Sequence, residues 1–475
     1  YALIPVKKDG ERLIVAMADP LNIFAIDDVK ITTGLEVVPV LATNQGISIA
    51  IDQYYETESV EKALAEFRRN YHIENANDMD IDEEILSEIS NAPVVKLVNT
   101  IIRQAVKMKA SDIHIEPFEK VIRVRFRIDG DLQEIMAPAK TTHSAIVTRI
   151  KIISKMDIAE RRLPQDGRVE MNLEGKEVDL RISVLPTVHG EKIVMRLLDR
   201  SSFLFTKQQL GFTEQNLKTF DKIIRSPNGI ILVTGPTGSG KTTTLYAVLK
   251  ELNQVSENVI TVEDPVEYQM DGVNQVQVNV KAGLTFAGGL RSILRQDPDI
   301  IMIGEIRDDE TAQIAVRAAI TGHLVLSTLH TNDTASSVTR LINMGVEPYL
   351  VSSSIVGITA QRLVKKICDN CKSAYTADIL EKRALKVEDM EEIIIYKGGG
   401  CNSCNNTGYK GRIAIHEILP ITKEIRLLID EGSSVDDIRE EAKKQGLVSL
   451  EDNCIQLVKE GVTTIEELLR VTYSI

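Results

Sequence analysis

The chain has 475 residues, of which 43% are hydrophobic, and this length is enough for about three domains of ordinary size. Its formal net charge of -13 argues against a protein that is held on nucleic acid by bulk electrostatics. No apolar run reaches the ~18 residues of a membrane-spanning helix. The sequence shows no signal peptide, and Tyr1 falls inside what reads as a domain, so we expect the natural N-terminus to lie upstream.

Residues 1–70 are predicted to form the C-terminal part of a small α/β domain. Two apolar strands are expected over 13–18 and 36–41, with a helix over 22–33 between them. The composition then turns acidic and polar. Residues 71–92 are therefore predicted to be a flexible linker.

Residues 93–200 are predicted to form an α+β domain with an antiparallel sheet. The stretch 122–128 alternates strictly between apolar residues and arginines, so Arg123, Arg125 and Arg127 share the face that points away from the core. Charges on such a face are ordinarily just solvated. Three arginines without an acid on the strand nevertheless favour an anionic partner, such as a phosphate presented by a neighbouring subunit.

The most specific motif lies near the start of the third domain, 214–475, which follows a second predicted linker at 201–213. Residues 235–242 fit G-x-x-x-x-G-K-[ST] at every fixed position. An apolar, β-branched strand precedes the motif, and a helix is expected over 243–253. Strand, glycine loop and helix are the context that a phosphate-binding loop requires.

The residue types of this loop match its chemistry. Its glycines let backbone N–H groups turn toward the phosphates, Lys241 reaches the β- and γ-oxygens, and Thr242 offers its hydroxyl to Mg²⁺. The residues expected to hold the nucleotide are Gly235, Pro236, Thr237, Gly238, Ser239, Gly240, Lys241, Thr242 and Thr243. The chain is therefore predicted to bind ATP or GTP together with Mg²⁺.

Acidic residues follow two further predicted strands. The strand over 258–262 leads into Glu263 and Glu267, and the strand over 299–304 leads into Glu305. The second resembles a Walker B strand in which Gly-Glu replaces the usual terminal Asp. Acids at these strand ends lie where Mg²⁺ and the attacking water are expected, so they are candidates for orienting or activating water. An acidic loop without a catalytic role is the alternative for the first pair.

Cationic candidates surround the second of these strands. Arg291, Arg295 and Arg307 flank it, and each is a candidate for stabilising charge on the transferred phosphate. The next predicted strand carries His323 at its start and His330 at its end. A lone histidine is more often structural, but two of them beside a nucleotide site are candidate γ-phosphate sensors.

Four cysteines form two C-x-x-C pairs within residues 366–411. They are Cys368, Cys371, Cys401 and Cys404. Each short loop can present two thiolates to one ion, so the pattern predicts a structural Cys₄ zinc site, with a redox dithiol as the rival. The gap between the pairs exceeds the ~15–20 residues of a zinc ribbon. Cys454 is unpaired and is expected to be a packed thiol, within a tail of short amphipathic helices over 421–475.

Taken in order, these motifs resemble those of the hexameric secretion ATPases that drive type IV pilus assembly and type II secretion. The similarity covers about residues 92–475. It implies a RecA-like ATPase domain preceded by a PAS-like domain. It also implies that the Glu263–Glu267 loop, Glu305 and the two-histidine strand surround ATP, and that the arginines at 123–127 approach ATP as the two domains close.

The same resemblance bears on branch, partners and ligands. The Cys₄ element is typical of the assembly and secretion branches, so pilus retraction is disfavoured. Residues 1–56 resemble the end of the N-terminal domain of these proteins. In some relatives that domain binds cyclic di-GMP, through a motif whose start is not in this sequence. A membrane platform protein is the implied partner.

The function predicted from the sequence is that of a cytoplasmic homohexameric ATPase, peripheral at the inner face of the membrane, that drives type IV pilus assembly. Type II secretion is the alternative. A DNA-handling motor is a candidate of a different class, and the charge of -13 and the absence of a basic-aromatic strip argue against it. A nucleotide-gated scaffold without turnover is a third possibility.

Overall fold

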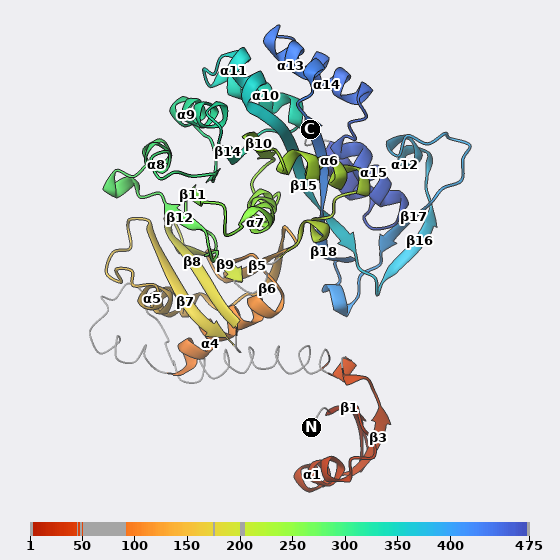
Figure 1. Ribbon diagram of the computed structural model, residues 1–475. Coiled ribbons are helices and arrows are strands. Elements are labelled where there is room, and N and C mark those ends of the chain that lie inside the picture. The colour runs from red at the N-terminus through yellow and green to blue at the C-terminus, as the bar shows by residue number, and fades with distance from the viewer. Residues whose placement is uncertain are drawn as a thin grey trace. The chain divides into compact units, whose positions relative to one another are not determined.

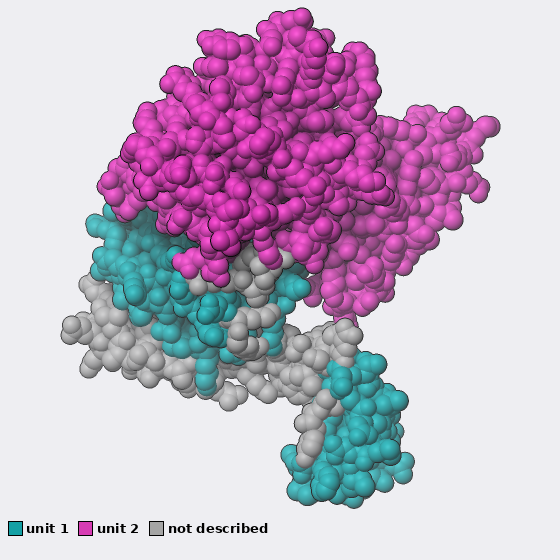
Figure 2. Space-filling view, in the orientation of Figure 1, with its two compact units in different colours: residues 1–199 teal, residues 200–475 magenta. Residues whose placement is uncertain are grey.

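The computed structural model describes residues 3–44, 46–47, 50, 92–173, 176–199 and 205–472. It divides into two compact units, residues 1–199 and 200–475, which Figure 2 shows in different colours. Residues 71–91 of the first predicted linker and 201–204 of the second lie outside the described residues. Among the described helices, none combines the length and the apolar character needed to cross a membrane.

The start of the first unit is a three-stranded sheet of order β1-β2-β3 that carries the helix α1. Its elements are β1 Leu3–Asp9, β2 Arg12–Met17, α1 Ile23–Thr33 and β3 Glu36–Leu41. The Asn22 side chain caps α1 by accepting from the N–H of Ala25, and Gly34 ends the helix at φ +69°. The helix packs on the sheet through the fully buried Ala25. The elements β2, α1 and β3 match the predicted strand–helix–strand order, and β1 was not predicted.

The rest of the first unit is a six-stranded antiparallel sheet of order β6-β5-β4-β9-β8-β7 with two helices (Figure 1). Its elements are α4 Ala92–Lys107, β4 Asp112–Pro117, β5 Ile122–Ile128, β6 Asp131–Met136, α5 His143–Ile153, β7 Gln165–Leu173, β8 Lys176–Thr187 and β9 Gly190–Asp199. Val124 and Phe126 of β5 are fully buried, as the alternation predicts. The expected antiparallel α+β domain is confirmed.

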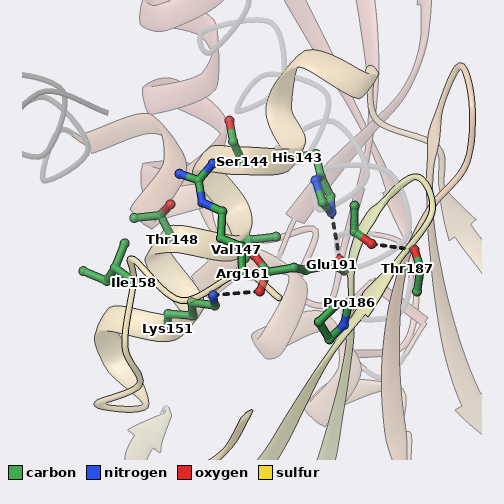
Figure 3. A pocket seen from close by; sticks show the side chains of 11 residues that line it. His143, Ser144, Val147, Thr148, Lys151, Ile158, Arg161, Pro186, Thr187 and Glu191 are labelled. Atoms are coloured by element: carbon green, nitrogen blue, oxygen red, sulfur yellow. Dashed lines mark hydrogen bonds and ion pairs between the residues drawn. The ribbon is translucent and has the colours of Figure 1, made fainter. Parts of the chain in front are cut away.

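A buried ion pair ties α5 to the start of β9. Lys151, only 1% exposed, lies 2.7 Å from the Glu191 carboxylate and donates to the carbonyl of Glu160 at 2.6 Å. A ring nitrogen of His143 lies 2.9 Å from the Glu191 carbonyl. These side chains border a hollow of about 170 Å³ (Figure 3). Because both buried charges are paired, their main effect is to fix this helix against the sheet.

The second unit is built on a seven-stranded sheet of order β12-β11-β13-β14-β10-β15-β18 (Figure 1). Its strands are β10 Gly229–Thr234, β11 Val259–Glu263, β12 Asn274–Gln277, β13 Ile300–Ile303, β14 Leu324–Leu329, β15 Ile355–Ile367 and β18 Tyr409–Pro420. Only the β15–β18 pair is antiparallel. The parallel strands therefore end at one common edge. Every residue of β10 and β14 is buried, as is typical of a parallel sheet covered on both faces.

Helices cover both faces of this sheet. The helices α6 and α7 pack on Ile231 and Val233 of β10, whereas α8 to α11 pack in the core that contains Ile230 and Leu232. The helices are α6 Glu214–Ile224, α7 Lys241–Leu252, α8 Phe286–Ile293, α9 Asp309–Ile320, α10 Thr334–Asn343 and α11 Pro348–Ser354. The alternation along β10 thus assigns each helix group to its own face.

The C-terminal part adds a small hairpin and short helices. They are β16 Lys372–Thr376, α12 Ile379–Ala384, β17 Ile394–Gly398, α13 Lys423–Asp430, α14 Val435–Lys444, α15 Leu450–Lys459 and α16 Ile465–Thr472. Short 3₁₀ turns are described at Lys140–Thr142, Lys207–Leu210, Val280–Ala282 and Asn402–Cys404. The expected short helices of the tail are therefore present, and Cys454 is a fully buried thiol of α15.

Candidate nucleotide site and metal centre

The glycine loop joins the end of β10 to the start of α7. Gly235, Gly238 and Gly240 have φ values of +146°, +79° and +88°, a region that favours glycine. The Lys241 ammonium donates to the carbonyls of Gly235 at 2.8 Å and of Pro236 at 3.1 Å. The lysine is therefore held within the loop, where phosphate oxygens can exchange for its carbonyl partners.

Burial lowers the pKa of Lys241 to about 8, an effect that Glu305 opposes and Arg362 reinforces. A bound phosphate favours the charged lysine and must raise this pKa. We therefore expect ADP binding to take up a proton above pH 8 but not at pH 7, and ADP affinity to fall as the pH rises through 8. Calorimetry in buffers of different ionisation enthalpy measures the uptake, and Lys241→Arg is the control that should abolish it.

Glu305 is the centre of a charged cluster at the carboxyl edge of the sheet. One carboxylate oxygen lies 2.6 Å from the Arg307 guanidinium, and the other lies 3.3 Å from Nε2 of His330. Glu305 follows β13 and His330 follows β14, and these neighbouring parallel strands end side by side. Since Glu305 also shifts the pKa of Lys241, the cluster adjoins the glycine loop. An acid here can orient a water molecule toward a bound γ-phosphate.

Glu263 is a buried anchor at the end of β11. Its carboxylate accepts from the Tyr246 hydroxyl at 2.5 Å, from Thr261 at 2.7 Å and from Gln275 at 3.1 Å. Burial and this carboxylate raise the pKa of Tyr246, so the phenol remains a donor. The same hydroxyl lies 3.3 Å from the backbone nitrogen of Glu267. The network thus fixes the loop that carries Glu267, and sequence reasoning missed Tyr246 because its helical position looks like ordinary core.

The prediction that both histidines face the γ-phosphate is wrong for His323. The Gly229 N–H donates to the His323 carbonyl at 3.0 Å, so His323 lies beside the start of β10. A strand of six residues at ~3.3 Å each puts it roughly 20 Å from the edge where His330 lies. Its Nδ1 lies 2.9 Å from the carbonyl of Ala318, which is a structural contact.

The three arginines around β13 have different partners and do not form one group. Arg307 contacts Glu305, whereas Arg291 forms an ion pair with Glu310 of α9. Arg295 donates to the Arg291 carbonyl at 2.9 Å. The residue after Arg295 binds Asn258, which precedes β11, so Arg295 lies toward the opposite edge of the sheet. This position, away from the glycine loop, gives no support to the prediction that Arg295 stabilises charge on the transferred phosphate.

The arginines of β5 have acidic neighbours that β5 itself does not supply. Arg123 pairs with Glu134 at 3.0 Å, Arg125 with Glu116 at 2.7 Å and Arg127 with Asp112 at 3.6 Å. The inference from a strand without acids therefore needs correction, because β4 and β6 provide them.

The strand register reveals a different arrangement of arginines. Arg127, Asp112, Arg196, Arg181 and Arg168 lie directly opposite one another across β5, β4, β9, β8 and β7. Directly paired residues share one face of a sheet, so these residues form a row that we call the arginine band. Sequence reasoning found only Arg127, because the other members depend on pairings between distant strands.

A hollow of about 250 Å³ adjoins the glycine loop. It is lined by Pro236 to Ser239, by Asn332 and Arg362, and by Glu467, Arg470 and Val471 of α16. Arg362, 6% exposed, donates to the carbonyl and side-chain oxygens of Asn332 at 3.0 and 3.1 Å. Sequence reasoning missed Arg362, because its strand also carries Thr359, Gln361 and two lysines and so gives no clear signal.

The four cysteines meet where two hairpins join. Cys368 follows β15, Cys371 precedes β16, and the other pair lies between β17 and β18. All four sulfur atoms lie within 4.8 Å of one another, and three pairs are separated by 3.7 to 3.8 Å. A tetrahedral ion with Zn–S distances of ~2.3 Å requires sulfur separations of about 3.8 Å. The cluster therefore fits a Cys₄ zinc ion.

Comparisons with known proteins agree with this geometry. The family model of "Type II/IV secretion system protein" matches residues 87–470, and that of the "MshEN domain" matches residues 1–61. The type IV pilus assembly ATPase PilB of Myxococcus xanthus is 47% identical, with 99% of this chain and 84% of that protein covered. The type II secretion system ATPase E of Vibrio cholerae is 48% identical, with 84% and 79% covered.

A solved structure of the pilus retraction motor PilT with bound ADP is also similar. The TM-score is 0.53 at 26% identity, and the match covers 78% of this chain and 95% of that chain. The fold is thus that of the RecA-like P-loop ATPases. The family match over most of the chain, the glycine loop and the Glu305 cluster lead to one conclusion: the chain belongs to the type II/IV secretion system protein family and is an ATP-hydrolysing P-loop ATPase.

Proposed function

We propose that this ATPase is a homohexameric motor that powers type IV pilus assembly through a membrane platform protein, from the cytoplasmic face of the membrane. The PilB relative supports this choice, with 47% identity over 99% of the chain. Type II secretion is the second candidate, since a type II secretion system protein E of Xanthomonas campestris is 46% identical over the same share of the chain.

The cluster of Glu305, Arg307 and His330 beside the glycine loop is the observation that carries the motor proposal. Lys241 and the loop amides hold the β- and γ-phosphates, and Thr242 ligates Mg²⁺. Glu305 or Glu267 positions the attacking water. Zinc is the ion that we propose for the Cys₄ cluster, where it would fasten the two hairpins together.

We further propose that the arginine band, together with Arg125, supplies positive charge to the nucleotide phosphates during the hydrolysis cycle. Arg196 is 60% exposed on its side chain and shares Asp112 with Arg127, so it can exchange this partner for a phosphate.

Replacing an arginine of the band, or Arg125, should therefore slow ATP turnover. We expect Arg196→Ala and Arg125→Ala each to lower kcat by about tenfold or more, the scale of one lost charge-assisted contact. Arg12→Ala, an exposed arginine of the N-terminal sheet, is the matched control and should have no effect. Mixed hexamers with Lys241→Ala subunits tell whether the arginines act within or between chains. An unchanged kcat in Arg125→Ala ends the proposal for that residue.

Co-purification of partner proteins distinguishes pilus assembly from type II secretion. The chain is captured from detergent-solubilised membranes of its own organism after cross-linking. Type IV pilin with a pilus platform protein supports pilus assembly, whereas secretion pseudopilins support type II secretion. Stimulation of ATP hydrolysis by DNA would revive the DNA-motor alternative instead.

A further inference from the structure

Gln361 of β15 contacts the glycine loop from a distant part of the sequence. The residue is 1% exposed. Its Nε2 donates to the carbonyl of Ser239 at 2.8 Å, and its Oε1 accepts from the Thr244 hydroxyl at 2.7 Å. One side-chain amide therefore bridges the residue before Gly240 and the first turn of α7. Lys241 and Thr242, the expected ligands of phosphate and Mg²⁺, lie between these two attachment points.

The bond to Ser239 determines where a phosphate-binding amide points. The Ser239 carbonyl and the Gly240 N–H belong to one trans peptide plane, so they point in opposite directions. Holding the carbonyl on Gln361 turns the Gly240 N–H away from Gln361. In loops of this type the amides at this position face the phosphate.

Two positions of the loop must be glycine because Gln361 lies so close to them. A Cβ on Gly235 would lie 2.5 Å from the Gln361 carbonyl oxygen, and a Cβ on Gly240 would lie 2.8 Å from its Nε2. The loop is therefore packed against the backbone and the side chain of the same residue. Movement of Gln361 would release both ends of the loop at once.

We propose that Gln361 is a positioning residue for the β-phosphate of the nucleotide. It acts through Ser239 and Thr244, and it fixes the Gly240 amide in the orientation that binds phosphate. The inference rests on nucleotide binding by the loop and is independent of the machine that the ATPase serves. It requires that Gln361 matter for ADP and ATP but not for AMP, which has no β-phosphate.

The test compares ADP and AMP affinities in matched variants. Gln361→Glu keeps the size of the side chain but removes the donor to Ser239, and Gln361→Leu removes both hydrogen bonds. Thr359→Val is the control, because Thr359 is a fully buried residue two positions earlier on the same face of β15. We expect both Gln361 variants to raise the Kd for ADP at least tenfold and the KM for ATP more than kcat falls. AMP affinity and the Thr359→Val values should stay within twofold of wild type.

Two results would overturn this inference without affecting the proposed function. One is an ADP affinity of Gln361→Glu equal to that of wild type, and the other is an equal loss of ADP and AMP affinity, which would indicate general damage. Melting temperatures without nucleotide show whether each variant is folded, and the isosteric Glu variant remains informative if Leu is not tolerated. Wild-type protein that binds no ADP would contradict the ATPase assignment itself and the inference with it.

Discussion

Glu305→Gln should abolish most ATP turnover while leaving nucleotide binding intact. The change keeps the size of the side chain but removes the negative charge that lies 2.6 Å from Arg307 and 3.3 Å from His330. Loss of a positioned acid or base costs about 10² to 10⁴ in rate. Phosphate release at saturating ATP and the Kd for ADP measure the two effects separately. Glu310→Gln is the matched control, because Glu310 pairs with Arg291 on the surface.

The binding measurement shows whether a slower rate comes from the chemical step or from weaker nucleotide binding. A variant that binds ADP normally but releases phosphate at least a hundredfold more slowly places Glu305 in the chemical step. Phosphate release unchanged from wild type would favour the nucleotide-gated scaffold, or would transfer the role of water activation to Glu267.

Removal of the metal is expected to unfold the hairpin region of the Cys₄ cluster. Structural zinc contributes about 10–16 kcal/mol of apparent binding energy in small zinc domains, so its loss far exceeds what β16 and β17 can offset. We expect one zinc per chain by elemental analysis and its loss in Cys371→Ser. Proteolysis should then cleave within residues 366–411. Cys454→Ala is the control and should retain the metal, because that thiol is not one of the four clustered cysteines.

Two outcomes would contradict the zinc site. The first is wild-type protein that contains no zinc before chelation, which would exclude the zinc site. Reversible formation of a disulfide in wild type, with no metal bound, would support the redox dithiol.

Local motifs were predictable because their residues are neighbours in the chain. The glycine loop reads as strand, loop and helix within one stretch, and each C-x-x-C pair presents its thiolates from one short turn. Glu305 was predictable for a related reason, since an acid that follows a buried parallel strand must lie at the carboxyl edge. In these cases sequence order alone determines position in space.

The errors and omissions have the opposite cause. His323 and His330 flank the two ends of β14, and only the pairing of β14 with β10 shows which end adjoins the loop. Gln361 reaches the loop because β15 pairs with β10, a contact between distant segments that no local pattern reports. The arginine band likewise requires the register of five strands.

The central claim is that ATP hydrolysis by this chain powers pilus assembly. The most direct measurement replaces the chromosomal gene with the Glu305→Gln allele in its own organism and counts surface pili and secreted proteins in the same cultures. The account predicts cells that make normal amounts of the chain but few or no pili, with secretion intact. Normal piliation, or loss of secretion with pili intact, would contradict it.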